Sequence, residues 1–100
     1  MEVKREYWSN GKLEYEKSYQ NGKLHGVYKH WRENGKLEYE RPYQNGKLHG
    51  ICKRWWGNGK LNYKEYWLYD DEVTQEGYRK HELIIQLSGL SDGNQKRILA

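Results

Sequence analysis

The chain has 100 residues, a formal net charge of +4 at pH 7 and a mean hydropathy of −1.30. A chain of this length is expected to form a single domain that is too small to bury a large core. The N-terminus lacks the apolar segment of a signal peptide and no run of residues is apolar enough to span a membrane, so we expect an intracellular, cytoplasmic protein.

One tetrapeptide, Asn-Gly-Lys-Leu, occurs five times in the first two thirds of the chain, at alternating steps of 11 and 13 residues. The two steps together define a unit of 24 residues, with copies at 10–33, 34–57 and, in diverged form, 58–78. A period of this size is typical of stacked supersecondary units. Asn-Gly is a strong signal for a two-residue hairpin turn, because both central residues of such a turn need a positive φ.

The segments between these turns are rich in Tyr, Trp, Val and Ile, which favour β-strands. Five turns therefore predict six strands in one twisted antiparallel meander, a mainly β fold. The expected strands span residues 3–9, 12–20, 23–33, 36–44, 47–57 and 60–68.

If every turn has two residues, the strand register follows, and with it the two faces of the sheet. One face is expected to be apolar, and an interaction surface there depends on Leu13, Tyr15 and Leu37 lying on the same side. The members predicted for this face are Trp8, Leu13, Tyr15, Tyr19, Leu24, Tyr28, Leu37, Tyr39, Tyr43, Leu48, Cys52, Trp56, Leu61, Tyr63 and Trp67.

The other face is expected to carry Val3, Tyr7, Val27, Trp31, Ile51 and Trp55 among charged residues. Opposite charges on neighbouring strands would help to set the register there, at about 0.2–1 kcal/mol for each pair. The predicted pairs are Arg5 with Glu16, Glu14 with Lys29, Lys29 with Glu40, and Glu38 with Lys53.

Three small or rigid residues predict local irregularities in the sheet. Gly26 and Gly50 occupy equivalent positions, opposite Tyr43 and Trp67 respectively, where a glycine lets the sheet bend. Pro42 has no N–H group, so we expect a bulge or a missing ladder bond at that point.

The repeat is expected to stop at "YDDE", where a sixth turn would otherwise fall. A helix is predicted next, with Thr74 as its N-cap and Gly89 as its stop. We therefore divide the single domain into a repeat array (1–68), a capping helix (69–90) and a short polar tail (91–100). The stripe predicted to dock the helix is Tyr78, Leu83, Ile84 and Leu87.

A single helix is too small to cover the predicted apolar face. About 14 residues of helix measure ~21 Å by ~10 Å, whereas six strands span roughly 24–29 Å. Either the sheet twists into a groove, or a second copy or another partner covers the face. The helix could dock on its own sheet or exchange with a neighbouring chain.

The unit "YQNGKLHGVYKHWRENGKLEYE" resembles the MORN repeat, and more closely its variant with two Asn-Gly hairpins per unit, found in bacterial and giant-virus proteins. The resemblance covers residues 3–68, and of the usual glycines Gly26 and Gly50 correspond. It implies a non-catalytic, elongated sheet used for protein contacts, scaffolding or assembly. Lipid binding and an antitoxin role, both attached to relatives, are the alternatives that it implies.

No residue pattern indicates an enzyme, a cofactor or a metal site. His25 and His49 are equivalent residues about two strands, or ~10 Å, apart, which is too far to share one metal ion. Cys52 is interpreted as a small buried side chain, with a reactive thiol as the alternative. The sequence does not favour nucleic acid as a partner, because charges of both signs alternate on the polar face.

The sequence therefore favours a protein-interaction module that associates with itself, as a homodimer, or with another protein. The predicted contact residues are Trp8, Tyr15, Tyr39, Trp56, Tyr63 and Trp67. The alternative is binding to an anionic membrane surface through rows of lysines at the turns. These lysines are Lys12, Lys23, Lys36, Lys47 and Lys60.

Overall fold

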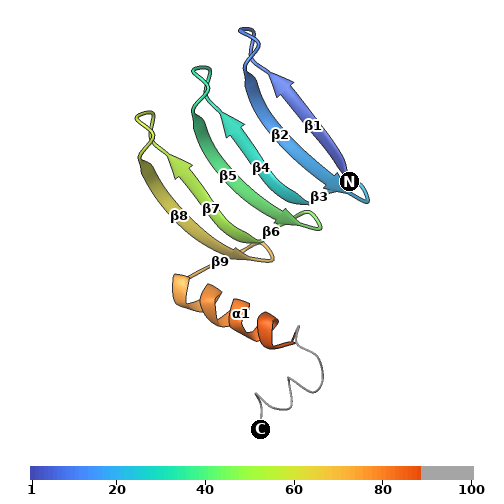
Figure 1. The fold of residues 1–100 in the computed structure, drawn as a ribbon. Coiled ribbons are helices and arrows are strands. Elements are labelled where there is room, and N and C mark those ends of the chain that lie inside the picture. Colours follow the sequence, from blue (N-terminus) through green and yellow to red (C-terminus); the bar gives the residue numbers. More distant parts are fainter. Residues whose placement is uncertain (89–100) are drawn as a thin grey trace.

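The computed structural model describes residues 1–88 as one antiparallel sheet followed by one helix (Figure 1). The sheet follows the chain in the order β1-β2-β4-β5-β7-β8-β9, so the predicted meander is confirmed. The elements are β1 (Glu2–Tyr7), β2 (Leu13–Gln20), β3 (Lys23–Leu24), β4 (Gly26–Trp31), β5 (Leu37–Gln44), β6 (Lys47–Leu48), β7 (Gly50–Trp55), β8 (Leu61–Leu68), β9 (Asp71–Val73) and α1 (Gln75–Ser88).

Two of the predicted strands are interrupted. Residues 23–33 contain β3 and β4 with His25 between them, and residues 47–57 contain β6 and β7 with His49 between them. At the first interruption, residues 25–28 face only residues 17–18 of β2, because the pairs Tyr19↔Leu24 and Glu16↔Lys29 enclose both segments. The chain therefore bulges there by two residues, and every later pairing on that side is displaced.

Glycine makes these bulges feasible. Gly26 and Gly50 have φ angles of 104° and 129°, which residues with a Cβ rarely adopt. Each glycine lies opposite its predicted partner, Tyr43 or Trp67. Pro42 faces the second bulge, where its carbonyl accepts a hydrogen bond from the His49 N–H group at 3.0 Å.

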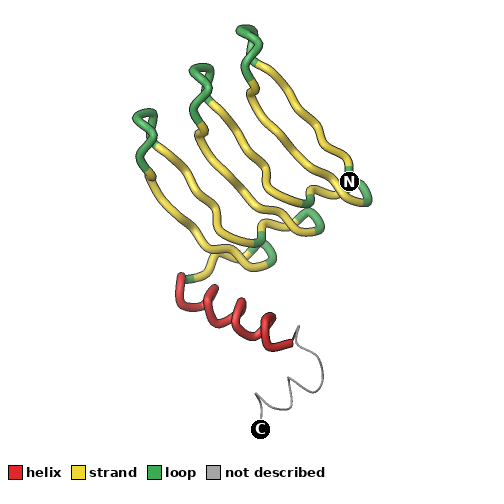
Figure 2. The backbone as a smooth tube through the Cα atoms, viewed as in Figure 1, coloured by secondary structure: helices red, strands yellow, loops and turns green. Residues whose placement is uncertain are grey.

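The five Asn-Gly sequences build two different turns, which lie at opposite ends of the hairpins (Figure 2). At Asn21-Gly22 the φ angles are 53° and 77°, and at Asn45-Gly46 they are 51° and 83°. These are the predicted two-residue turns with positive φ at both central residues.

The other three turns are longer than predicted. In the first, the Trp8 N–H group donates to the Lys12 carbonyl at 2.7 Å, and Gly11 N–H donates to the Trp8 carbonyl at 2.9 Å. The loop therefore contains three residues, 9–11, and only the glycine has a positive φ. Equivalent bonds form at the turns that end at Lys36 and Lys60.

A bulge follows each of the longer turns and reverses the predicted face of one leucine. Tyr7 pairs with Leu13 whereas Glu6 pairs with Tyr15, so Glu14 is an extra residue between the two pairs. Because paired residues share a face, Leu13 lies on the opposite side from Tyr15. Leu37 and Leu61 are reversed in the same way, and the prediction that these leucines join the tyrosines is wrong.

We call the two sides the tyrosine face and the ladder face. The tyrosine face carries the side chains that share a side with Tyr15, Tyr28 and Tyr39. The ladder face carries a row of paired charges across the middle of the sheet. That row is Arg5, Glu16, Lys29, Glu40, Lys53 and Lys64.

The charge row corrects two predicted pairs. Lys29 pairs with Glu16 rather than Glu14, and Lys53 pairs with Glu40 rather than Glu38, because the bulges at His25 and His49 displace the register. The predicted pairs of Arg5 with Glu16 and of Lys29 with Glu40 are confirmed. Arg5 Nε lies 2.8 Å from the Glu16 carboxylate.

The array continues past the point where the sequence predicted its end. Tyr69 and Asp70 have φ angles of 49° and 73°, so they form a third two-residue turn without glycine. This turn leads into β9, which pairs with β8. The Asp70 carboxylate accepts a hydrogen bond from Leu48 N–H at 2.6 Å, and this bond helps to hold the turn.

Helix α1 closes the array at the β9 edge, leaving both faces of the sheet open (Figure 1). Thr74 is its N-cap, as predicted, with Oγ1 accepting from Gly77 N–H at 3.0 Å. The predicted stop at Gly89 and the tail 91–100 lie outside the described residues. Within the described part of the chain, no helix has the length and apolarity needed to cross a membrane.

Candidate interaction surface

A stack of aromatic rings crosses the tyrosine face from β2 to β5. The Tyr15 and Tyr28 ring centroids lie 6.0 Å apart, and those of Tyr28 and Tyr39 lie 5.7 Å apart, with interplanar angles of 26° and 23°. His30 continues the stack at 5.0 Å from Tyr39. The register brings these rings together, since His30 is paired with Tyr15 on one side and with Tyr39 on the other.

Cations lie over the stacked tyrosines. Lys17 Nζ is 4.6 Å from the Tyr15 centroid and 5.0 Å from that of Tyr28, and the Arg41 guanidinium is 4.5 Å from Tyr39. Burial, followed by the hydrogen bond with Tyr39, raises the pKa of Tyr28 despite these cations. The hydroxyl is therefore protonated at neutral pH, and the surface offers apolar ring faces beside polar donors.

Glu38 joins the strands beside this stack. Its carboxylate lies 2.8 Å from His30 Nδ1, 3.3 Å from Arg32 Nη1 and 3.5 Å from Arg54 Nη2. Sequence reasoning placed Glu38 on the other face, but as the bulged residue it points to the tyrosine face. Glu38 therefore ties β4, β5 and β7 together where the sequence showed only a surface charge.

The six predicted contact residues all lie on the tyrosine face, but they differ in exposure. Trp8, Tyr15, Tyr39 and Trp67 are half-buried, whereas Trp56 and Tyr63 are 55% and 37% exposed. Trp8 also has a structural role, because its Nε1 donates to the Trp31 carbonyl of the next unit at 3.1 Å.

The predicted helix docking stripe contacts the sheet at its first residue. The Tyr78 ring lies 5.5 Å from the Tyr66 ring, and His81, which was not predicted, lies 5.7 Å from His49 and 5.8 Å from Tyr69. By contrast, Leu83 and Ile84 are 57% and 61% exposed, whereas Leu87 is half-buried. The helix thus rests on the edge of the sheet through its first turns rather than along its whole apolar stripe.

The five turn lysines are exposed, as the membrane alternative requires, but two of them also connect hairpins. Lys12 Nζ lies 3.4 Å from the Asn34 carbonyl, and Lys36 Nζ lies 3.4 Å from the Gly57 carbonyl. Asn10 makes a shorter contact of the same kind, from Nδ2 to the Glu33 carbonyl at 2.9 Å. These contacts show that the turns hold adjacent units together.

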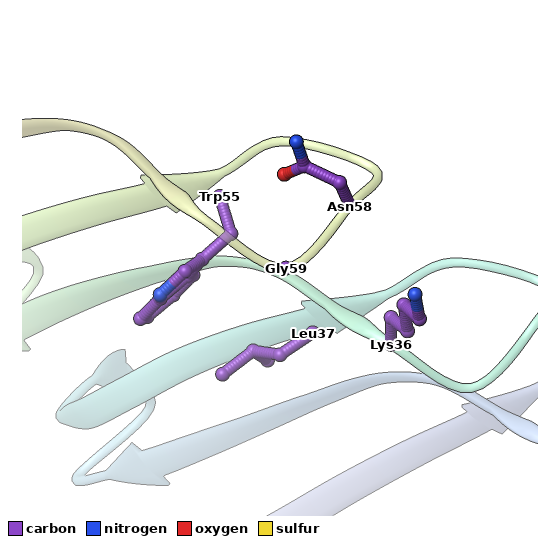
Figure 3. A pocket seen from close by; sticks show the side chains of 5 residues that line it. All are labelled: Lys36, Leu37, Trp55, Asn58 and Gly59. Carbon is purple, nitrogen blue, oxygen red and sulfur yellow. The ribbon is translucent and has the colours of Figure 1, made fainter.

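The ladder face has an apolar row that sequence reasoning missed. The reversed leucines pair there with large rings, as Tyr7↔Leu13, Trp31↔Leu37 and Trp55↔Leu61. Between the second and third longer turns the row leaves a shallow, open hollow of about 350 Å³ (Figure 3). The hollow is lined by Lys36, Leu37, Trp55, Asn58 and Gly59.

The buried groups of the sheet suit structure better than chemistry. Cys52 is 4% exposed, and burial raises the pKa of its thiol to about 11, so the interpretation as a buried side chain is confirmed. His49 Nδ1 accepts from Tyr69 N–H at 3.2 Å. Among residues 1–88, no group of three or more His, Cys, Asp or Glu side chains could hold a metal ion.

Comparison with known proteins identifies the repeat. The family described as MORN repeat variant matches residues 3–21, 24–45 and 48–69. No curated protein and no solved structure matches the chain. Repeats of this family are in general non-catalytic modules for contacts with proteins or membranes. Because its three matches cover most of the chain and coincide with the hairpin units, the protein belongs to the MORN repeat variant family.

Proposed function

We propose that the chain is a non-catalytic protein-interaction module that binds another protein through its tyrosine face. The observation that carries this proposal is the half-buried stack of Tyr15, Tyr28 and Tyr39 with Lys17 and Arg41 over its rings. Tyrosine, tryptophan and arginine are the residues that contribute most binding energy at protein interfaces. The exposed rings of Trp56 and Tyr63 extend the same surface toward the end of the array.

The composition of the tyrosine face favours a protein partner over a lipid surface. It carries carboxylates as well as cations, and Glu38 holds its own cluster of His30, Arg32 and Arg54. An anionic membrane would instead need free cations on one side of the molecule. Lys12 and Lys36 direct their ammonium groups toward the carbonyls of the next hairpin.

Self-association through this face, as the sequence suggested, loses its main argument. The interaction surface predicted from the sequence, for a second copy or for any other partner, needed Leu13 and Leu37 beside Tyr15. The bulges after the longer turns place both leucines on the ladder face, so the protein contact proposed here depends on the ring stack instead. We assign the tyrosine face to a different protein.

Site-specific photo-crosslinking tests the proposal with two adjacent positions. Tyr63 and Lys64 are both exposed neighbours on β8 that point to opposite faces, so a benzophenone amino acid at each samples one face. In the cells that naturally make the protein, we expect protein adducts from position 63 and few from position 64. Equal adducts from both positions, or none from position 63, would overturn the proposal. Adducts of twice the chain mass from position 63 would instead assign this face to self-association.

A further inference from the structure

Strand β1 is an open edge of the sheet. All of its six residues are exposed, and its inner side pairs with β2. Trp8 directs its N–H and carbonyl groups inward, toward Lys12 and Gly11. Because these groups alternate along an antiparallel strand, Val3, Arg5 and Tyr7 direct theirs outward. An edge of this kind is a template for another strand.

The opposite end of the array does not fit this edge. Within the array, Glu16 faces Lys29 and Glu40 faces Lys53 wherever one unit meets the next. On β8, Lys64 occupies the position equivalent to these glutamates, and on β1, Arg5 occupies the position equivalent to the lysines. Stacking one chain on the end of another would therefore set Lys64 against Arg5 of the next copy. Strand β9 and helix α1 also cover part of that end.

We propose that two copies of the chain pair through β1, antiparallel and related by a two-fold axis at Arg5. The backbone groups limit the register of this pairing. A residue whose N–H and carbonyl groups point outward can face only another residue of that kind, and the same holds for residues whose groups point inward. An axis at Lys4 would set Glu2 against Glu6 of the other copy. An axis at Arg5 instead sets Lys4 against Glu6, with opposite charges, and Val3 against Tyr7.

This register also buries apolar surface. It places the two Arg5 residues opposite each other at the axis, where each keeps its own counter-charge. Val3 and Tyr7 are 43% and 58% exposed in the single chain, and each would gain an apolar neighbour. Each Arg5 already has its own carboxylate, since Nε lies 2.8 Å from Glu16. The paired copies would form one continuous sheet with both tyrosine faces on the same side. The partner that fits this edge is therefore a second copy of this chain.

The solution mass of backbone variants tests the pairing, by sedimentation equilibrium of the full chain. We expect the wild type to reach twice its 12.2 kDa mass with rising concentration. Arg5→Pro removes an outward N–H group and should remain monomeric. Arg5→Ala, which loses the same ion pair with Glu16 but keeps the N–H group, is the matched control and should still form dimers. A wild type that stays monomeric at about 1 mM, which corresponds to a dimer Kd well above that concentration, would overturn the proposal. An Arg5→Pro variant with wild-type dimerisation would overturn it as well.

Charge variants test the register. Glu6→Lys sets like charges together at both symmetry-related positions, so we expect about tenfold weaker dimerisation at low salt. The double variant Lys4→Glu with Glu6→Lys restores opposite charges and should restore the dimer. Failure of this rescue would exclude the register at Arg5. Tyr39→Ser should leave dimerisation unchanged, which separates this interface from binding by the tyrosine face.

Discussion

At the scale of single residues, the two bulge glycines have the same role but unequal surroundings. A Cβ on Gly50 would lie 2.7 Å from Pro42 Cγ, whereas a Cβ on Gly26 would lie 3.4 Å from Ser18 Cβ. Both substitutions strain a backbone with positive φ, but only the first also creates a clash with a rigid ring. The residue that faces each bulge, Pro42 or Ser18, therefore determines how much stability a substitution of the glycine removes.

We expect Gly50→Ala to lower the free energy of unfolding by about 3 kcal/mol and Gly26→Ala by about 1–2 kcal/mol. Urea titration followed by tryptophan fluorescence measures both values. Pro42→Ser, which copies the first unit, should recover part of the loss in Gly50→Ala. Equal losses at the two glycines would show that the contact with Pro42 has no effect.

His49 should make the stability depend on pH. Burial, and next the charge of His81, lowers its pKa from the usual 6.5, while Glu82 acts in the opposite direction. A histidine with a lowered folded pKa binds a proton more readily once the chain unfolds. The contribution of neutral His49 to the free energy of unfolding is therefore complete above pH 6.5. It is lost as the pH falls from 6.5 through the pKa of His49 in the folded protein.

The unfolding free energy of the wild type should consequently decrease between pH 7.5 and about pH 5, a range chosen around the usual histidine pKa. In His49→Gln the amide oxygen can still accept from Tyr69 N–H, and this decrease should be smaller. Denaturant titrations at the two pH values measure the difference. Identical pH dependence in both proteins would exclude His49 as its source.

At the scale of elements, one tetrapeptide forms two turns because Asn-Gly suits both. In the longer turns Asn10, Asn34 and Asn58 keep a negative φ, and their side-chain oxygens accept from the N–H group of the following lysine at 2.9, 3.0 and 2.9 Å. In the shorter turns the asparagine itself adopts a positive φ. Local sequence predicted where the chain reverses but not the loop length, which fixes the face of each leucine.

The charge row gives a prediction for one strand pair. Lys53 and Lys64 face each other on β7 and β8, the only like-charge pair in the row that runs from Arg5 to Lys64 across the described sheet. Lys64→Glu should restore the alternation and raise the unfolding free energy by about 0.2–1 kcal/mol. Lys64→Gln should recover part of this gain. Because Lys64 is exposed and Lys53 is only half-buried, salt should screen the pair. An effect that persists unchanged in 1 M salt, where the Debye length is about 3 Å, would point to another cause.

At the scale of the whole molecule, the meander followed from the 24-residue period and the closing helix from the capping signal and apolar stripe after Thr74, but the manner of closure followed from neither. The sixth turn uses Tyr69 and Asp70, which carry no turn signal as strong as Asn-Gly. The Asp70 carboxylate accepts a hydrogen bond from Leu48 N–H, and the ring of His49, between β6 and β7, contacts the ring of His81 on α1. These contacts join residues more than 20 positions apart, so no local pattern could show them.

The same long-range regularity predicts how the molecule responds to a longer array. Each unit contacts its neighbours through equivalent bonds, such as Gly46 N–H to the Leu24 carbonyl and Asp70 N–H to the Leu48 carbonyl, both at 2.8 Å. A second copy of residues 34–57 inserted after Gly57 should therefore add one more interface of the same kind. We expect the variant to unfold at a higher urea concentration than the wild type.

Small-angle scattering should show the array longer by about 10 Å, because two strands add at ~4.8 Å each. The ends of the array stay unchanged, so β1, β9 and α1 should keep their contacts, and the mass per copy should rise only by the inserted residues. A matched insertion with Gly50 of the new copy replaced by alanine should lose most of the added stability, because that copy could not form its bulge. An inserted unit that left stability unchanged would mean that the two ends, rather than the interfaces between units, hold this sheet together.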